Sequence, residues 1–331
     1  MAQAVLQARC EIRKKIISYP VAACVSANSS CLAVISTRFR QELTYPVLFY
    51  ARLDKDAEPV YKRGITIFTD LKTRHATHLA TDEDRKLIFV AGDSGRVQAF
   101  RWDEPATLRS HEESSGVKAH TLQSYDHLGG VEVLPGGRFV RGGRGEMAVW
   151  NLDGLERQRG GNSPSTTVGL KDRLSPWTLH YHRGSGKLLA AEAVHFEEND
   201  RCASIDMEHG GRTAVRYLGH ADEVLAFSSS AGDPNVFATA CKDAYARIYD
   251  IRQPLPVITV ETATRTDHGC SNVVLTHPNG IPGKLFLVTL TSKSGHLFVR
   301  LCSTFHDRRR PTVYQGVGPP CTDDSLRPVD G

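Results

Sequence analysis

Apolar and polar residues alternate over short stretches along most of this chain. In residues 245–249, Ala246 and Ile248 share one face of an extended segment, and polar or aromatic residues occupy the other. Turns rich in Gly, Asp, Pro and Asn, such as residues 232–235, separate these stretches. A period of two residues between closely spaced turns predicts an all-β chain of antiparallel hairpins.

Four β-type runs follow one another in the region after Gly219. They are Val224–Ser228, Val236–Cys241, Tyr245–Tyr249 and Val257–Glu261. Four short antiparallel strands within roughly 40 residues make one blade of a β-propeller. We therefore predict a blade in this region.

Weaker modules of the same kind recur along the chain. The third strands of these modules are expected to end near Tyr50, Phe100, Trp150, Ile205, Tyr249 and Arg300. The spacing is close to 50 residues, as propeller repeats require, whereas an all-β sandwich would have hairpins without a fixed period. The expected fold is an all-β β-propeller of four-stranded antiparallel blades. Six blades are countable, and seven are possible if the chain is truncated.

The pattern divides the chain into three expected parts. Residues 18–302 would form the propeller. Residues 1–17 would supply either a closing outer strand or a short helix, and both fit their pattern. Residues 303–331 are polar and contain several prolines, so we expect a disordered tail.

Composition and charge narrow the class of protein. Lys and Arg number 41 and Asp and Glu 37, a net charge of +4 that is too small to predict a nucleic-acid or membrane binder by itself. The eight cysteines contain no CxxC pair, and the charged start is unlike a cleavable signal. These features predict reduced thiols and a cytoplasmic and/or nuclear location.

One uncharged stretch raises the question of a membrane anchor. Residues 16–37 are long enough to span a bilayer. Pro20, several hydroxyl residues and the turn at residues 28–30 interrupt the stretch, and two short strands fit it better. No membrane association is expected.

Residues 219–252 resemble a WD repeat. The Gly-His that opens such repeats stands at Gly219-His220, and the ending S-x-D-x-T-x-x-x-W-D corresponds to Cys241, Asp243, Tyr245, Tyr249 and Asp250. Cys replaces Ser, and Tyr replaces both Thr and Trp, but order and spacing are retained. The resemblance is specific here and weaker over the rest of residues 18–302.

The resemblance implies a buried hydrogen-bonded tetrad in this repeat. It would consist of His220, Asp243, Tyr249, and either Thr239 or Cys241 as the strand hydroxyl or its substitute. Buried imidazole and carboxylate groups must satisfy each other or cost several kcal/mol. The tetrad is therefore expected to be structural, and no catalytic residue is predicted.

Other short motifs fit turns better than chemistry. Gly92–Gly95 echoes a protease nucleophile segment, but a hairpin turn favours the same residue types. Residues 183–187 lack the first glycine and the hydroxyl of a phosphate-binding loop. His180 and His182 share a strand face without a third metal ligand. No cofactor and no metal are expected.

The predicted function is a non-enzymatic scaffold that mediates protein–protein interactions. Residues 237–252 also resemble the box by which some WD-repeat proteins dock to the adaptor of cullin-type ubiquitin ligases, which implies a substrate receptor with Asp250 and Arg252 at the partner surface. A further alternative is an RNA-binding propeller. It would use the arginines of one hairpin, Arg138, Arg141 and Arg144.

Overall fold

The computed structural model describes fourteen segments of the chain. They are residues 19–26, 31–40, 43–52, 60–61, 65–66, 75–103, 118–156, 161–170, 174–192, 202–230, 233–262, 269–276, 284–291 and 297–303. The expectations for residues 1–17 and for the tail beyond residue 303 lie outside the described residues.

The chain divides into two compact units, residues 1–181 and 182–331. The first unit begins with a sheet of β1 (Tyr19–Val25), β2 (Cys31–Arg40), β3 (Leu43–Arg52), β4 (Val60–Tyr61) and β5 (Ile65–Thr66). The next sheet is β6 (Ala76–Asp82), β7 (Leu87–Gly92), β8 (Arg96–Arg101) and β9 (Lys118–Gln123). The third is β10 (Val131–Leu134), β11 (Arg138–Gly142), β12 (Glu146–Asn151) and β13 (Thr166–Gly169).

The fourth sheet carries the boundary between the units. It consists of β14 (Pro176–His182), β15 (Lys187–Glu192), β16 (Cys202–Asp206) and β17 (Arg212–Tyr217). The second unit continues with β18 (Val224–Ser229), β19 (Val236–Cys241), β20 (Tyr245–Asp250) and β21 (Pro256–Glu261). The last sheet is β22 (Cys270–Thr276), β23 (Lys284–Thr291) and β24 (Leu297–Ser303).

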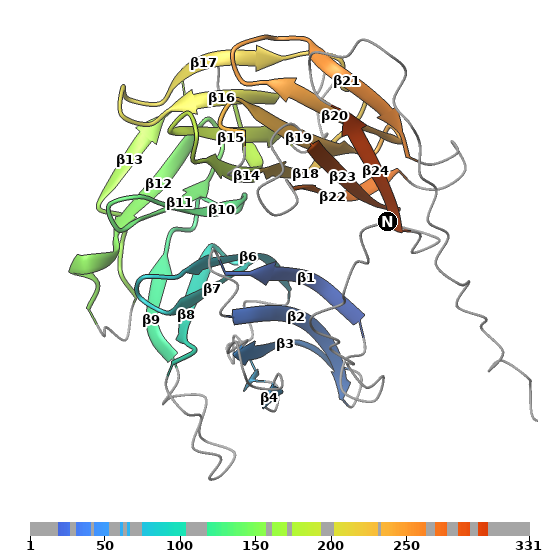
Figure 1. Cartoon of the computed structure of the whole chain (residues 1–331). Coiled ribbons are helices and arrows are strands. Elements are labelled where there is room, and N and C mark those ends of the chain that lie inside the picture. Colours follow the sequence, from blue (N-terminus) through green and yellow to red (C-terminus); the bar gives the residue numbers. More distant parts are fainter. Residues whose placement is uncertain are drawn as a thin grey trace, which may run out of the picture. The chain divides into compact units, whose positions relative to one another are not determined.

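The all-β prediction is confirmed, and the succession of antiparallel blades is that of a β-propeller. In the sheets from β6 to β24, strands that follow one another in the chain lie side by side (Figure 1), whereas in the first sheet β4 and β5 both pair with β3. Within the described residues the single 3₁₀-helix, Leu152–Gly154, is the one regular element that is not a strand. Nor does that part of the chain contain a helix long and apolar enough to cross a membrane.

The expectation of six blades is wrong, because five regular blades are present. Four sheets have four strands each, and β22–β24 form a blade with three described strands. The first sheet departs from the pattern. Its strands β2 and β3 are ten residues long, and β3 pairs on its other side with two strands of two residues, β4 and β5. The sequence pattern identifies hairpins, and hairpins occur both in a regular blade and in this irregular sheet. The number of blades predicted from hairpins was therefore too high.

Aromatic residues join the second and third sheets of the first unit. Phe89 of β7 stacks on Phe139 of β11 with ring centroids 4.5 Å apart, and Phe139 packs on Trp150 of β12 at 5.8 Å. All three side chains are buried. Burying each aromatic side chain contributes on the order of 2–3 kcal/mol, so this stack is a main source of cohesion in the unit.

A buried arginine ties the same two sheets together. The guanidinium of Arg141, on β11, donates hydrogen bonds to the carbonyls of Gly92 at 2.6 Å and Arg96 at 3.3 Å, which flank the β7–β8 turn. Its side chain has no exposed surface. Burial lowers the pKa of Arg141 to about 10, which still leaves it charged at neutral pH.

The second unit has its own aromatic centre. Phe237 of β19 stacks on Tyr249 of β20 at 5.2 Å, and Tyr217 of β17 meets the ring of Phe237 edge-on at 4.7 Å. The Tyr217 hydroxyl donates to the carbonyl of Ile251 at 2.8 Å. The end of β17 is therefore fixed against the turn that follows β20.

Gly95 is a position at which the backbone requires glycine. Its φ is +76°, and a Cβ there would lie 2.2 Å from the carbonyl oxygen of Ser124. Gly136 has a similar φ of +72° but no atom within 4 Å of the same position. Alanine substitutions at the two glycines therefore distinguish the energetic cost of the left-handed backbone from the cost of the steric clash.

We expect Gly136→Ala to lower the free energy of unfolding by about 1 kcal/mol, because only the left-handed backbone is penalised. Gly95→Ala should lower it by about 3 kcal/mol or more, because the clash with Ser124 adds to that penalty. Urea unfolding followed by tryptophan fluorescence would measure both. Equal losses in the two variants would contradict the close approach of the β7–β8 turn to Ser124.

Candidate functional site

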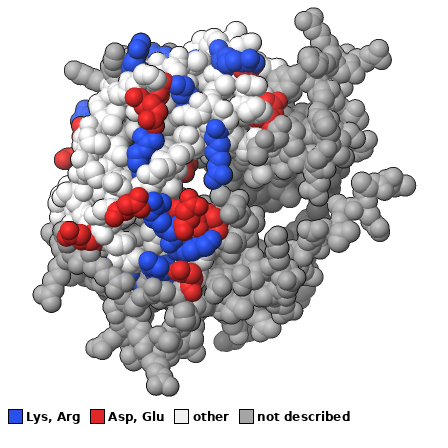
Figure 2. All heavy atoms as spheres, turned by 60° about the vertical axis from the view of Figure 1, so that its left-hand side comes forward, with Lys and Arg blue, Asp and Glu red and all other residues white. Residues whose placement is uncertain are grey.

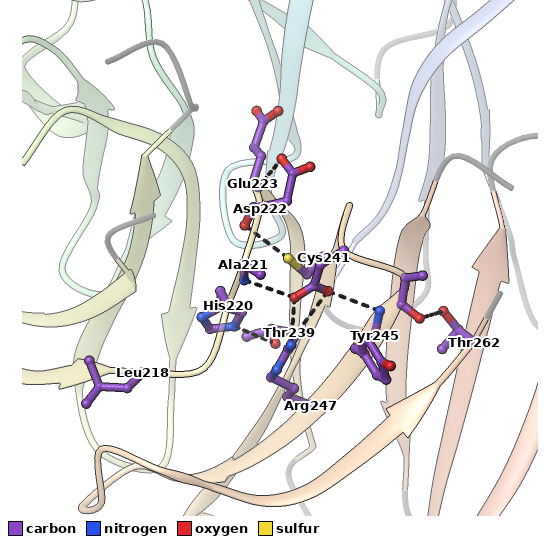
Figure 3. Close-up of polar contacts among 12 residues, drawn as sticks. Leu218, His220, Ala221, Asp222, Glu223, Thr239, Cys241, Tyr245, Arg247 and Thr262 are labelled. Atoms are coloured by element: carbon purple, nitrogen blue, oxygen red, sulfur yellow. Dashed lines mark hydrogen bonds and ion pairs between the residues drawn. The ribbon is translucent and has the colours of Figure 1, made fainter. Parts of the chain in front are cut away.

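The residues singled out by the WD-like repeat lie in the sheet β18–β21 of the second unit (Figure 3). His220 belongs to the connection between β17 and β18. Thr239 lies on β19, Asp243 in the β19–β20 turn and Tyr249 on β20. Local sequence explains the turn, because Asp243 accepts the backbone N–H of Tyr245 at 3.1 Å, a contact that short polar side chains make in turns.

Three of the four tetrad residues are in contact, because Thr239 and Tyr249 both approach the imidazole of His220. Nε2 of His220 lies 3.0 Å from the hydroxyl of Thr239 and 3.3 Å from that of Tyr249. The Tyr249 hydroxyl donates to the carbonyl of Leu218 at 2.8 Å, so toward His220 it acts as an acceptor. A proton on Nε2 would allow the imidazole to donate to this oxygen. Thr239 therefore occupies the hydroxyl position, while the thiol of Cys241 donates to the carbonyl of Asp222.

The carboxylate of Asp243 has a different partner from the one the resemblance implies. Its two oxygens accept two hydrogen bonds from the guanidinium of Arg247, at 2.6 and 3.0 Å, and each side chain of the pair is only 7% exposed. It also accepts the backbone N–H of Ala221 at 3.0 Å. Nδ1 of His220 is buried without a hydrogen-bond partner. Asp243 therefore pairs with Arg247 and forms no hydrogen bond with the imidazole of His220.

Arg247 is the residue that the sequence reasoning missed. The alternation in residues 245–249 places Arg247 on the same strand face as Tyr245 and Tyr249, four residues after Asp243. A buried arginine on a strand face that it shares with two tyrosines needs a carboxylate. That requirement was the available signal, and the family pattern drew attention to His220 instead.

The protonation states at this site follow from burial and from Arg247. Burial, and then the positive charge of Arg247, lower the pKa of His220 to about 4, so the imidazole is neutral at neutral pH. Burial alone would raise the pKa of Asp243, but hydrogen bonds from Arg247 and Ala221 hold it below its ordinary value. Burial also raises the pKa of the Tyr249 hydroxyl.

The arrangement is suited to holding chain segments together. A neutral imidazole is able to accept a proton, but its described neighbours are a fully buried threonine and a tyrosine whose own proton is bonded to a carbonyl. The network joins the connection before β18, the β19–β20 turn and strand β20. No described group in it faces solvent as a nucleophile would need to.

The two residues predicted to bind a partner lie at the end of β20. Asp250 accepts three hydrogen bonds from Arg252, one from its backbone N–H at 3.0 Å and two from the guanidinium at 2.8 and 2.5 Å. The Arg252 side chain is 68% exposed and that of Asp250 14%. The pair is thus a surface feature, with the arginine outermost.

The arginines of the RNA alternative do not form one surface. Arg141 is fully buried, and the Nε of Arg138 donates to the carbonyl of Pro135, which leaves Arg144 as the most open of the three. Figure 2 shows Lys and Arg interspersed with Asp and Glu over the described residues of the face that it draws. A phosphate backbone requires a continuous basic surface, which these three residues do not supply.

The motifs set aside as turns are found in turns. Residues 92–95 connect β7 and β8, and residues 183–186 connect β14 and β15. His182 bonds to Ser185 through Nδ1 and to the carbonyl of Val236 through Nε2. The described segments hold no group of three or more His, Cys, Asp or Glu residues able to bind a metal ion. Cys31, Cys202 and Cys241, three of the cysteines in these segments, are free thiols.

Comparison of the chain with models of known protein families and with curated protein sequences gives no match. The resemblance to a WD repeat therefore rests on the sequence of residues 219–252 and stays a prediction.

The lowered pKa of His220 predicts a pH dependence of stability. The unfolded chain takes up a proton on His220 near pH 6.5, whereas the folded chain does so only near pH 4, so the free energy of unfolding should fall between these values as the pH is lowered. His220→Gln should reduce the fall in this window. Urea unfolding at several pH values would measure it, with the exposed His75→Gln as the control that leaves it unchanged.

The buried ion pair predicts a strong effect of a conservative change. Asp243→Asn leaves the buried guanidinium of Arg247 without its carboxylate, and we expect a loss of about 3–5 kcal/mol in the free energy of unfolding. The same change at the surface pair, Asp250→Asn, should cost about 0–1 kcal/mol. The double variant Asp243→Asn/Arg247→Met should recover part of the loss. Similar losses in the two single variants would show that the Asp243–Arg247 pair does not stabilise the blade.

Proposed function

We propose that this chain is a non-enzymatic scaffold of the WD-repeat type, which binds other proteins in the cytoplasm or nucleus. The observation that carries the proposal is a group of large apolar side chains left exposed in the second unit. Leu218, Leu255 and Val257 are 54%, 61% and 44% exposed. Exposed apolar residues that gather in one place mark surfaces for association.

The polar chemistry of the site supports a binding role. The imidazole, carboxylate and hydroxyl groups of the WD-like repeat are occupied by one another, by Arg247 and by backbone groups. They stabilise the strands of this blade, and rigid strands that hold loops in fixed positions suit recognition. A propeller hosts many functions, so the argument depends on these residues and not on the fold.

A second candidate is the substrate receptor of a cullin-type ubiquitin ligase, docking through residues 237–252. The observation that favours it is the position of Arg252, which is highly exposed and oriented by Asp250. Guanidinium groups held in this way form directional contacts with carboxylates. RNA binding is less well supported, because Arg141 is buried.

One purification experiment tests both candidates. The tagged full chain would be recovered from cells after mild cross-linking, together with the variants Leu255→Ser and Arg252→Ala and the control Arg144→Ala, which changes an exposed arginine of the first unit. We expect stoichiometric protein partners with the wild type and a reduced yield with Leu255→Ser. If the chain is a ligase receptor, the cullin adaptor is recovered with the wild type and lost with Arg252→Ala.

The outcomes separate the candidates. Equal recovery of the cullin adaptor with the wild type and Arg252→Ala, or its absence from both, removes the ligase candidate and leaves the scaffold. A wild-type chain that is recovered alone, with no cross-linked protein, removes the scaffold itself. Circular dichroism dominated by β-structure in every variant would show that the fold is retained.

A further inference from the structure

Three exposed apolar residues of the second unit come from neighbouring segments, and we call them the Leu218 cluster (Leu218, Leu255 and Val257). The backbone N–H of Leu218 donates to the carbonyl of Pro254 at 2.8 Å, directly before Leu255. Gly219 packs against the ring of Pro256, with a Cβ position 3.7 Å from its nearest carbons. These contacts bring the segment after β17 against the start of β21, so that Leu218 lies next to the Leu255–Val257 segment.

Two buried tyrosines fix the backbone that carries the Leu218 cluster and the adjoining turn. The hydroxyl of Tyr249 donates to the carbonyl of Leu218, and that of Tyr217 donates to the carbonyl of Ile251 in the adjoining turn. Both tyrosines are buried in the aromatic centre of the unit. A rigid apolar surface loses little conformational entropy when a partner covers it, which favours binding.

The polar rim offers a partner a hydrogen-bond donor. Arg252 uses Nε and Nη2 to bind Asp250, and its Nη1 makes no hydrogen bond. Asp250 orients the guanidinium of Arg252, and Asp233 accepts the backbone N–H of Asn235. Arg216, which lies on β17 two residues before Leu218, is a second exposed arginine close to it in the sequence.

The three residues of the cluster carry no carboxylate that could accept a hydrogen bond from Arg252. An acidic partner would instead supply the carboxylate that Nη1 of Arg252 lacks.

We infer that the Leu218 cluster binds an acidic amphipathic segment of a partner protein. Apolar side chains of that segment cover Leu218, Leu255 and Val257, and a flanking Glu or Asp carboxylate accepts a hydrogen bond from Arg252. The inference rests on the proposed scaffold function and names the chemistry of the partner at one surface of it.

Two synthetic helical peptides of equal length test the inference. They share a leucine face, and one carries Glu and the other Lys at the flanking positions. Binding to the full chain would be measured by fluorescence anisotropy at moderate salt. We expect the Glu peptide to bind about tenfold or more tightly than the Lys peptide, which corresponds to about 1.4 kcal/mol.

Variants of exposed residues assign the binding to the cluster. Leu218→Ser/Val257→Ser should weaken the Glu peptide about tenfold, and Arg252→Gln should reduce the preference for Glu over Lys. The matched control is Tyr125→Ser/Leu128→Ser, which changes exposed apolar residues of the first unit, 64% and 41% exposed, and should leave binding unchanged.

Three results would overturn the inference. They are equal affinity of the two peptides, an equal loss in the control variant, and no binding of the Glu peptide. None of them removes the scaffold proposal, which depends on the recovery of partner proteins. Circular dichroism of each variant shows whether the fold is intact before the affinities are compared.

Discussion

The buried ion pair between Asp243 and Arg247 is the interaction on which the best-defined blade depends. A carboxylate with so little exposed surface is unfavourable unless several donors surround it. Here two guanidinium nitrogens and two backbone N–H groups do so. They come from the connection before β18 and from strand β20, while Asp243 itself lies in the β19–β20 turn. One side chain thus fixes three segments, and the position of His220 follows from them.

This arrangement explains why the conspicuous polar residues of the repeat point to architecture. The imidazole is neutral and lies between two hydroxyls, and the carboxylate is saturated by its donors. The carboxylate is thus occupied within the blade, and Nδ1 of His220, which has no hydrogen-bond partner, is buried. The same network fixes the backbone at Leu218, whose carbonyl accepts a hydrogen bond from Tyr249 and whose side chain is exposed.

Much of the fold could be predicted because alternation is a local property. The third strands predicted near Phe100, Trp150 and Tyr249 are present as β8, β12 and β20. The contact of His220 with Thr239 and Tyr249 also agrees with the spacing of the motif.

The sequence does not show which of several possible partners a polar side chain binds in the folded chain. Asp243 is within reach of two cationic or donor side chains, and Arg247 prevails because two charge-assisted hydrogen bonds are stronger than one bond to a neutral imidazole. Likewise, a hairpin rich in arginine and glycine gives no sign that Arg141 turns into the core. The irregular first sheet shows that the outermost strand is not encoded by the pattern of its neighbours.

Arg141 has a consequence for the motions of the first unit. Its guanidinium is enclosed by protein and bonded to the carbonyls on both sides of the β7–β8 turn. If that turn moved away alone, a bare cation would remain in apolar surroundings, which is costly. The β7–β8 turn is therefore held against the third sheet and moves away only when the second and third sheets separate. Hydrogen exchange of the amide protons in this turn should then report the cooperative unfolding of the whole unit and not a local opening.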